Sequence, residues 1–344
     1  MGGSKNVFAA VKSYSKRGKL LKNTDFQTLA ESRDLDELMT RIKNTSYGES
    51  ISDVQKPFTS QGIENALRGH LADIHYSIAK TAGESKVLDA YFSKFLISNL
   101  KQILKGKVLG KSQEEIEIHI NFRAEELTKQ RDVVVKALVA GDLEEAVASL
   151  NQAEFGEEIS KAAALYEDKK NIQIFDTYFD KILFTRLVKA LKSGGIDAGK
   201  IIGMDIDFYN ILSVIRGKFW GLDDAQIQDL IIVQCPVAKD LLTRMMSAGT
   251  IKDAFNELSN TKYKNLIPSV ENELDAISEF ERAFELAIYQ ASLNSFTKMF
   301  SFATTIGITK LTAFEVRNLA AIAYAVEQKI PTETTMSKLI LMTE

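Results

Sequence analysis

The segment Gly-Lys-Val-Leu-Gly-Lys-Ser at residues 106–112 resembles a loop that binds nucleotide phosphates through glycine backbone N–H groups. Such a loop needs four residues between its glycines, and this segment has three. The segment also follows a predicted helix, whereas the nucleotide loop follows a strand. Gly217 and Gly221 recur at matching places without the Lys-Ser pair. We therefore predict a glycine-capped helix C-terminus, with no nucleotide or other cofactor bound.

Metal and nucleophile chemistry have few candidate residues in this chain. His70 and His75 are five residues apart, which puts them on different helix faces, and His119 is the third histidine. We therefore predict no metal site. The single cysteine, Cys235, excludes an internal disulfide framework and favours a reducing compartment. We expect it to be a small buried residue, although the sequence leaves open a nucleophile paired with a histidine.

Composition and charge exclude several classes of protein. The chain has 344 residues, of which 45% are hydrophobic, and 43 basic residues nearly balance 46 acidic ones. A net charge of -3 gives no general attraction to nucleic acid. The apolar run 319–326 is too short to span a bilayer, and no export signal is visible at the N-terminus. Four prolines favour long helices, so we predict an all-α protein.

The N-terminal segment 1–22 contains six basic side chains and no acidic one. This segment is suited to a phospholipid surface or an acidic partner, and equally to an ordinary basic surface. The basic residues are Lys5, Lys12, Lys16, Arg17, Lys19 and Lys22.

A threefold internal repeat organises the chain. Three segments share an aliphatic residue, a small residue three positions later, an aromatic two later and an isoleucine four after that. The aromatics are Tyr47, Phe155 and Tyr263, which are equally spaced along the chain. We expect them to be buried packing anchors. The repeat predicts three similar helical domains at residues 1–112, 113–222 and 223–344.

An asparagine recurs downstream of each aromatic, at Asn99, Asn210 and Asn318. Asparagine is a poor residue for a helix interior, so its recurrence indicates a fixed polar contact. One interpretation is a hydrogen bond that ties a helix to a neighbouring loop, and the other is a side chain directed into a shared central cavity. We favour the tie.

Steps of three and four between apolar residues predict long amphipathic helices. One continues from Ile172 to Leu191 and another from Leu274 to Met299. Helices of about 35 residues would be about 50 Å long. We expect the last long helix to begin at a capping box, Thr312–Glu315, and to stop before Pro331.

Four segments carry a resemblance to the C subunit of the archaeal and bacterial A/V-type ATPases, the homologue of the d subunit of eukaryotic V-ATPase. The order of these segments and the total length agree with that family. Three positions depart from it: Ser98 precedes Asn99 where the family often has a charged residue, Leu96 replaces an acid three residues before Asn99, and Ala325 stands where the other repeats have glycine. The four segments are Tyr14–Leu21, Leu38–Ile51, Asp207–Lys218 and Glu315–Ala323.

The resemblance implies a non-catalytic adaptor in a rotary ATPase. Its three helical domains would form a funnel around a pseudo-threefold axis, bind the foot of the central stalk and lie on the membrane rotor ring. It would help couple ATP synthesis or hydrolysis to proton or sodium transport. It would be peripheral, on the cytoplasmic side, and attached to the membrane through the ring. The implied partner-binding or structural residues are Asp207, Asn210, Arg216, Glu315, Arg317 and Asn318.

The sequence leaves two other classes of protein open. A helical scaffold outside any rotary machine would share the repeat. A helical enzyme would use Cys235 or buried carboxylates, and it would need a cavity lined by titratable groups that converge.

Overall fold

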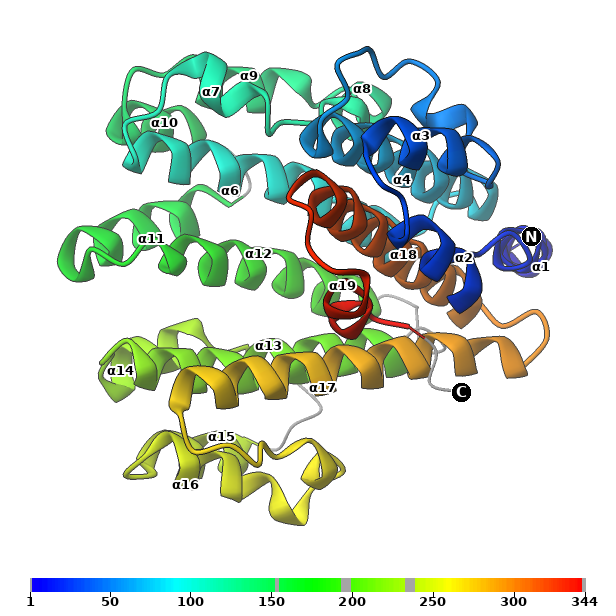
Figure 1. Cartoon of the computed structure of the whole chain (residues 1–344). Coiled ribbons are helices and arrows are strands. Elements are labelled where there is room, and N and C mark those ends of the chain that lie inside the picture. Colours follow the sequence, from blue (N-terminus) through cyan, green and yellow to red (C-terminus); the bar gives the residue numbers. More distant parts are fainter. Residues whose placement is uncertain (1, 152–154, 193–198, 233–238, 342–344) are drawn as a thin grey trace. The chain divides into compact units, whose positions relative to one another are not determined.

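The protein is all-α in a computed structural model of the chain (Figure 1). The structure describes residues 2–151, 155–192, 199–232 and 239–341, with side chains from residue 5 onward. The structure is 77% helical, and the described residues contain no strand. The predicted fold class is confirmed. The predicted pseudo-threefold funnel and the domain boundaries after residues 112 and 222 stay predictions, and Cys235 lies outside the described residues.

The chain divides into two compact units, of which unit 1 comprises residues 1–139 and 289–344 and unit 2 comprises residues 140–288. Helix α17 (Glu273–Asn294) contributes to both. Unit 1 contains α1 (Gly2–Arg17), α2 (Asn23–Ala30), α3 (Leu35–Lys43), η1 (Glu49–Ile51), α4 (Ser60–Ala82), α5 (Lys86–Phe92), α6 (Lys94–Val108), α7 (Gln113–Glu117), α8 (Arg123–Thr128), α9 (Arg131–Val139), η5 (Ser295–Thr297), α18 (Ala303–Glu327) and α19 (Thr332–Lys338). Unit 2 contains α10 (Leu143–Leu150), α11 (Gly156–Lys169), α12 (Gln173–Lys192), α13 (Gly199–Phe219), α14 (Asp224–Leu230), α15 (Lys239–Ser247), α16 (Ile251–Asn256), η3 (Glu257–Asn260) and η4 (Lys264–Leu266).

The short helix before each repeated aromatic begins in the same register. Helices α3, α10 and α16 start at Leu35, Leu143 and Ile251, which are separated by the same interval as the aromatics. Each follows an N-cap residue whose side-chain oxygen accepts a hydrogen bond from the backbone N–H three residues later. These N-caps are Asp34, Asp142 and Thr250. The equal spacing of the aromatics is therefore also a spacing of helix starts.

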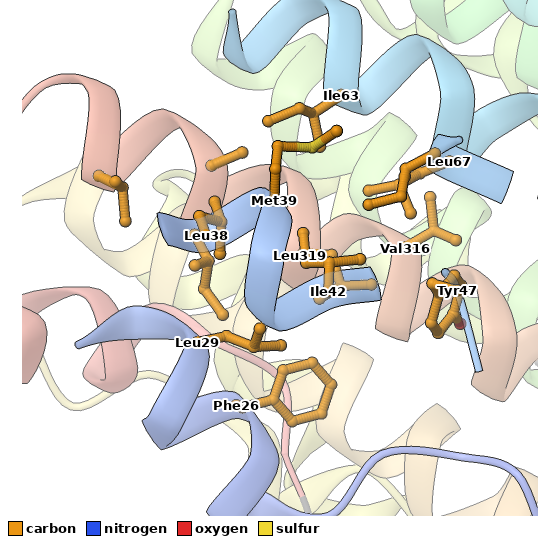
Figure 2. Packing of buried hydrophobic residues seen from close by; sticks show 14 of the residues in the cluster. Phe26, Leu29, Leu38, Met39, Ile42, Tyr47, Ile63, Leu67, Val316 and Leu319 are labelled. Atoms are coloured by element: carbon orange, nitrogen blue, oxygen red, sulfur yellow. The ribbon is translucent and has the colours of Figure 1, made fainter. Parts of the chain in front are cut away.

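The core of unit 1 joins the two ends of the chain. Apolar side chains of α2, α3 and α4 converge on one side of α18 (Figure 2). Leu38 and Ile42 of α3 and Leu67 of α4 are fully buried, and Leu319 of α18 is 1% exposed. Since burying one such side chain contributes about 1.5–3 kcal/mol, this contact is a large part of the stability of unit 1.

All three long helices that carry the repeated asparagines end in the same way. Helices α6, α13 and α18 each stop nine residues after their asparagine. A backbone N–H just past each end then donates to a carbonyl five residues earlier, at 3.0 Å for Gly106, 2.9 Å for Gly217 and 2.8 Å for Ala325. Gly110 and Gly221 adopt φ of 64° and 68° at these ends. This is the Schellman cap, so the segment at 106–112 is a helix end, as predicted.

Gly106 and Gly217 allow the following short helix to pack closely. A Cβ atom on Gly106 would lie 2.5 Å from Cγ1 of Ile116, and one on Gly217 would lie 2.7 Å from Cγ1 of Ile227. The third repeat has Ala325 at this place, and Thr335 stands ten residues later where the other repeats have isoleucine. In the third repeat the larger residue on the long helix, Ala325, is thus paired with a smaller residue on the short helix, Thr335.

This size match gives a stability prediction. We expect Gly106→Ala to lower the free energy of unfolding by about 1–3 kcal/mol, because the new methyl group overpacks against Ile116. Ile116→Thr reproduces the pair found in the third repeat, so the double variant should recover much of the loss. Urea unfolding of both single variants and the double variant measures this coupling, and additive losses would contradict the prediction.

Two predicted helix boundaries are wrong. Helix α17 ends at Asn294, not at Met299, and the short 3-10 helix η5 follows it. Helix α18 begins at Ala303, so Thr312 lies inside the helix and is no cap. Its hydroxyl donates to the Ile308 carbonyl at 2.9 Å. Threonine is tolerated in a helix when its hydroxyl bonds to the preceding turn. The longest described helix, α18, has 25 residues, fewer than the expected length of about 35.

Candidate functional site: repeated asparagine ties and buried carboxylates

Each repeated asparagine holds a loop by two hydrogen bonds. The amide of Asn210 donates to the Ile232 carbonyl at 3.1 Å, and its oxygen accepts from the Ile232 N–H at 2.8 Å. Asn318 does the same with Ile340, at 2.7 and 3.0 Å. Asn99 pairs with Asn121, at 2.9 and 3.2 Å. The partner is 22 residues downstream every time.

The asparagine side chain suits this task because its amide carries both a donor and an acceptor. It satisfies a backbone N–H and a backbone carbonyl of one residue that no helix or strand pairs. All three asparagines are buried, with at most 3% exposure. The contact is therefore a tie between a long helix and the loop that follows the next short helix.

The first tie contains an additional carboxyl group. The Asn99 amide also donates to Oε1 of Glu125 at 2.9 Å, and Glu125 is 1% exposed. Burial raises the pKa of this carboxyl group, although the hydrogen bond from Asn99 opposes the shift. The sequence pattern did not indicate Glu125, because its chain position has no counterpart in the repeat that we recognised.

Glu315 joins three segments of unit 1. One carboxylate oxygen accepts from the Tyr47 hydroxyl at 2.6 Å, and the other accepts from the Leu21 N–H. Glu315 is 6% exposed. Burial raises its pKa to about 7, with a smaller contribution from the negative charge of Asp25, while the two hydrogen bonds act in the opposite direction.

Asp207 occupies the same place in unit 2 but has a different neighbour. Its Oδ2 accepts from the Tyr263 hydroxyl at 2.5 Å and lies 3.0 Å from the Lys262 ammonium group. Ser46 stands at the position of Lys262 in the first repeat, so the residue before Tyr47 supplies no such cation to Glu315. The remaining repeat has Leu96 in place of the acid and Phe155, which has no hydroxyl group. The acid and the hydroxyl group are present together or absent together.

The repeated aromatics are buried, as the spacing predicts. Tyr47, Phe155 and Tyr263 are 2%, 5% and 4% exposed. In Tyr47, burial and the charge of Glu315 raise the pKa of the hydroxyl group well above its usual value, so it remains a hydrogen-bond donor at any physiological pH.

The two arginines of the predicted set are more accessible. Arg216 is half-buried and forms an ion pair with Glu281 at 2.7 Å. Arg317 is exposed on α18, and its guanidinium lies 5.2 Å from the centre of the Phe314 ring. The other members of the set are buried in ties within their own units, whereas the arginines reach the surface. These buried members are Asp207, Asn210, Glu315 and Asn318.

Two lysines also hold helix ends, a role that the sequence pattern did not predict. Lys107 donates to the Leu138 carbonyl at the end of α9 at 2.8 Å. Lys218 donates to the Met246 and Ala248 carbonyls at the end of α15, at 2.7 and 2.6 Å. Lysine at a helix C-terminus satisfies carbonyls that lack an intrahelical partner. The sequence feature that could have indicated this role is the repeated Gly-Lys pair, at 106–107 and 217–218, the first of which also resembled part of a phosphate loop.

One histidine, His75, forms a buried contact between two helices of unit 1. His75 is buried, and its Nε2 lies 3.0 Å from the Thr309 carbonyl oxygen. Burial lowers the pKa of His75 well below its usual value, and that of His70 to a smaller extent. Across the part of the chain that the structure describes, no three His, Cys, Asp or Glu side chains gather in a metal-binding group. None of the helices described is long and apolar enough to cross a membrane.

These features define a class: an all-helical repeat protein whose recurring polar residues tie helices to loops. Comparison with known proteins gives the family. The chain matches the family model described as "ATP synthase (C/AC39) subunit" over residues 9–338, and it belongs to that family. The resemblance noted in the sequence is thereby confirmed.

Several archaeal relatives are similar over most of their length. An A-type ATP synthase C subunit of Methanocaldococcus jannaschii is 27% identical, over 95% of this chain and 84% of that protein. The A-type ATP synthase C subunit of Pyrococcus horikoshii is 23% identical, over 92% of this chain and 85% of its own length. The A-type ATP synthase C subunit of Thermococcus onnurineus is 26% identical, over 92% of this chain and 84% of that protein. The chain is thus a subunit of the ATP synthase type.

Proposed function

We propose that the chain is the non-catalytic rotor adaptor of a V/A-type ATPase or ATP synthase, connecting the central stalk to the membrane rotor ring. The observation that carries the proposal is the family match over residues 9–338, since it covers nearly the whole length of this chain and not one short segment of it. The relatives are named as subunits of an A-type ATP synthase, so partners within such a complex follow from the family. We place this chain at the cytoplasmic face of the membrane, attached through the ring.

The repeated ties support a mechanical role. A part that transmits torque has to keep its shape under load, and one bidentate asparagine contact fixes each of α6, α13 and α18 to a loop 22 residues away. Buried hydrogen bonds of this kind are costly to break, because both backbone groups would lose their partners. The same geometry would also serve a static scaffold, and binding of stalk subunits by α18 variants distinguishes the two.

The exposed side of α18 is the surface that we assign to the stalk. Its exposed residues recur in steps of four, three and three, which places them along one side of the helix. They are Arg317, Ala321, Tyr324 and Glu327, and Tyr324 is 55% exposed. An arginine and an exposed tyrosine on one helix are the residue types enriched at protein interfaces.

We expect Arg317→Ala to weaken binding of the purified subunit to the stalk subunits by about tenfold or more, with stability changed by less than about 0.5 kcal/mol. The weakening should diminish at high salt, because a charge contact at a rim is screened. Binding is measured by titration and stability by thermal unfolding of the same sample. A loss of stability with unchanged affinity would remove Arg317 from the interface. Unchanged affinity for both Arg317→Ala and Tyr324→Ala would place the stalk contact on another surface, and no binding of the unchanged subunit to the stalk subunits would favour a scaffold outside the rotary machine.

A further inference from the structure

Helix α1 has an apolar face that no part of unit 1 covers. Val7, Phe8 and Val11 are 39%, 64% and 50% exposed. The opposite side of the helix, with Ala9 and Ala10, is fully buried where α1 packs against α4 and α18. We call the first set the α1 face. Because α1 is anchored by its buried side, this face points outward from a fixed support.

A row of lysines borders the α1 face. Lys5, Lys12 and Lys16 are spaced by seven and four residues, which puts them on one side of the helix next to Phe8. Lys12 also contacts α4, because its ammonium group donates a hydrogen bond to the Ser77 carbonyl at 3.1 Å. No basic residue of the segment 1–22 forms an ion pair with a carboxylate of the described residues.

The positive charges of this segment repel one another. Partial burial and the neighbouring charges of Lys19 and Lys12 lower the pKa of Lys16. A negatively charged surface placed against α1 would relieve this repulsion and would stabilise the protonated lysines.

A second exposed apolar segment lies close to α1. The Tyr14 hydroxyl donates to the Phe296 carbonyl of η5 at 2.7 Å, and the two rings are 5.1 Å apart. Just beyond, Met299 and Phe300 are 70% and 49% exposed. In Figure 1 the loop that contains them, drawn in orange, lies beside α1. Phe300 has φ of 59°, an unfavourable conformation for a bulky residue, and its ring remains half exposed.

We propose that α1 binds the interface of an anionic lipid bilayer, with the α1 face inserted between headgroups and the lysine row on the phosphates. A protein partner is less suited, because three side chains on a convex helix offer far less than the roughly 1,000 Å² of a stable protein interface. A fluid lipid surface needs no matching groove, and each nearby basic residue adds to the attraction. The contact is separate from the proposed stalk surface on α18, and it requires neither stalk nor ring.

The test is flotation of the purified full chain with vesicles. One set is phosphatidylcholine alone, and the other contains about one third phosphatidylglycerol. We expect binding to the anionic set alone, and loss of binding when salt is raised from about 0.05 to about 0.5 M. Phe8→Asp and Val11→Asp should each reduce the affinity at least about fivefold, and the double variant Lys16→Glu/Lys19→Glu about 25-fold.

Matched controls separate this surface from general effects. Leu274→Asp removes another largely exposed apolar side chain, and Lys136→Glu/Lys189→Glu gives the same change of net charge elsewhere. Both should bind as the unchanged chain does. Thermal unfolding should be similar for all variants, since the altered side chains are at least partly exposed. Equal binding to both vesicle types, an unaffected Phe8→Asp, or equal losses in the controls would overturn the proposal. Absence of any vesicle binding would also overturn the proposal, and an acidic protein would then be the expected partner of this segment.

Discussion

Asn318→Ala should lower the free energy of unfolding by about 3 kcal/mol. The change leaves the N–H and the carbonyl of Ile340 without partners, and Ile340 is 2% exposed, so water does not readily replace the lost side chain. Each buried unsatisfied group costs about 1–3 kcal/mol, and the better helix propensity of alanine recovers only about 0.5 kcal/mol. Urea unfolding of the full chain measures the loss.

The neighbouring residue supplies the control for this prediction. Arg317→Ala removes a larger side chain from the same turn of α18, but that side chain is exposed, so its effect on stability should stay below about 0.5 kcal/mol. Asn210→Ala should resemble Asn318→Ala, because it breaks the same pair of bonds in unit 2. A loss under about 1 kcal/mol for both asparagines would mean that the ties contribute little.

Protonation of Glu315 should make stability depend on pH. Its pKa is about 7 in the folded protein and 4.5 at its ordinary value. A carboxyl group whose pKa is raised by folding stabilises the fold fully below its ordinary pKa, and this contribution is lost as pH rises through the folded pKa. At 1.36 kcal/mol per unit, the loss between pH 4.5 and above pH 7 is about 3 kcal/mol. Tyr47, Asp25 and Tyr289 are the titratable groups coupled to it.

Two variants isolate this contribution from all other titrating groups. The stability difference between the unchanged chain and Glu315→Gln should fall by about 3 kcal/mol over that pH range, since glutamine does not titrate. Ser46→Lys copies the cation that Lys262 supplies to Asp207, so it should lower the pKa of Glu315 and flatten the pH dependence. Measuring unfolding in urea at several pH values decides the question, and a difference that is independent of pH would refute the raised pKa.

The fold class, the repeat and the structural ties could be predicted because they depend on residue type and spacing. An amide at a helix position, recurring at Asn99, Asn210 and Asn318, indicates a fixed contact whatever its partner. The glycine caps followed from glycine's access to positive φ at Gly110 and Gly221. The start of α18 was missed because Thr312 and Glu315 have the spacing of a capping box, although the Thr312 hydroxyl group bonds back to the preceding turn of the helix.

The partners of the buried carboxylates could not be predicted in the same way. Glu315 contacts Leu21 and Tyr47, which are 294 and 268 residues away, and no local pattern reports such a contact. A close inspection of the repeat would have paired the acid with the aromatic, since Leu96 lacks the acid and Phe155 lacks the hydroxyl group. The environment that raises the pKa of Glu315 depends on burial, which a sequence pattern gives only approximately.

The contact between the N-terminal helices and α18 has a consequence for how the chain is made. Unit 2 is one continuous stretch, residues 140–288, whereas unit 1 combines residues 1–139 with 289–344. During synthesis, α2, α3 and α4 leave the ribosome long before the helix that covers their apolar side chains has been translated. Contacts between residues far apart in the sequence form slowly, and the apolar side chains of α2, α3 and α4 are prone to aggregation while they remain exposed. Unit 2 can therefore complete its structure first, and the arrival of residues 289–344 determines when residues 1–139 can do so.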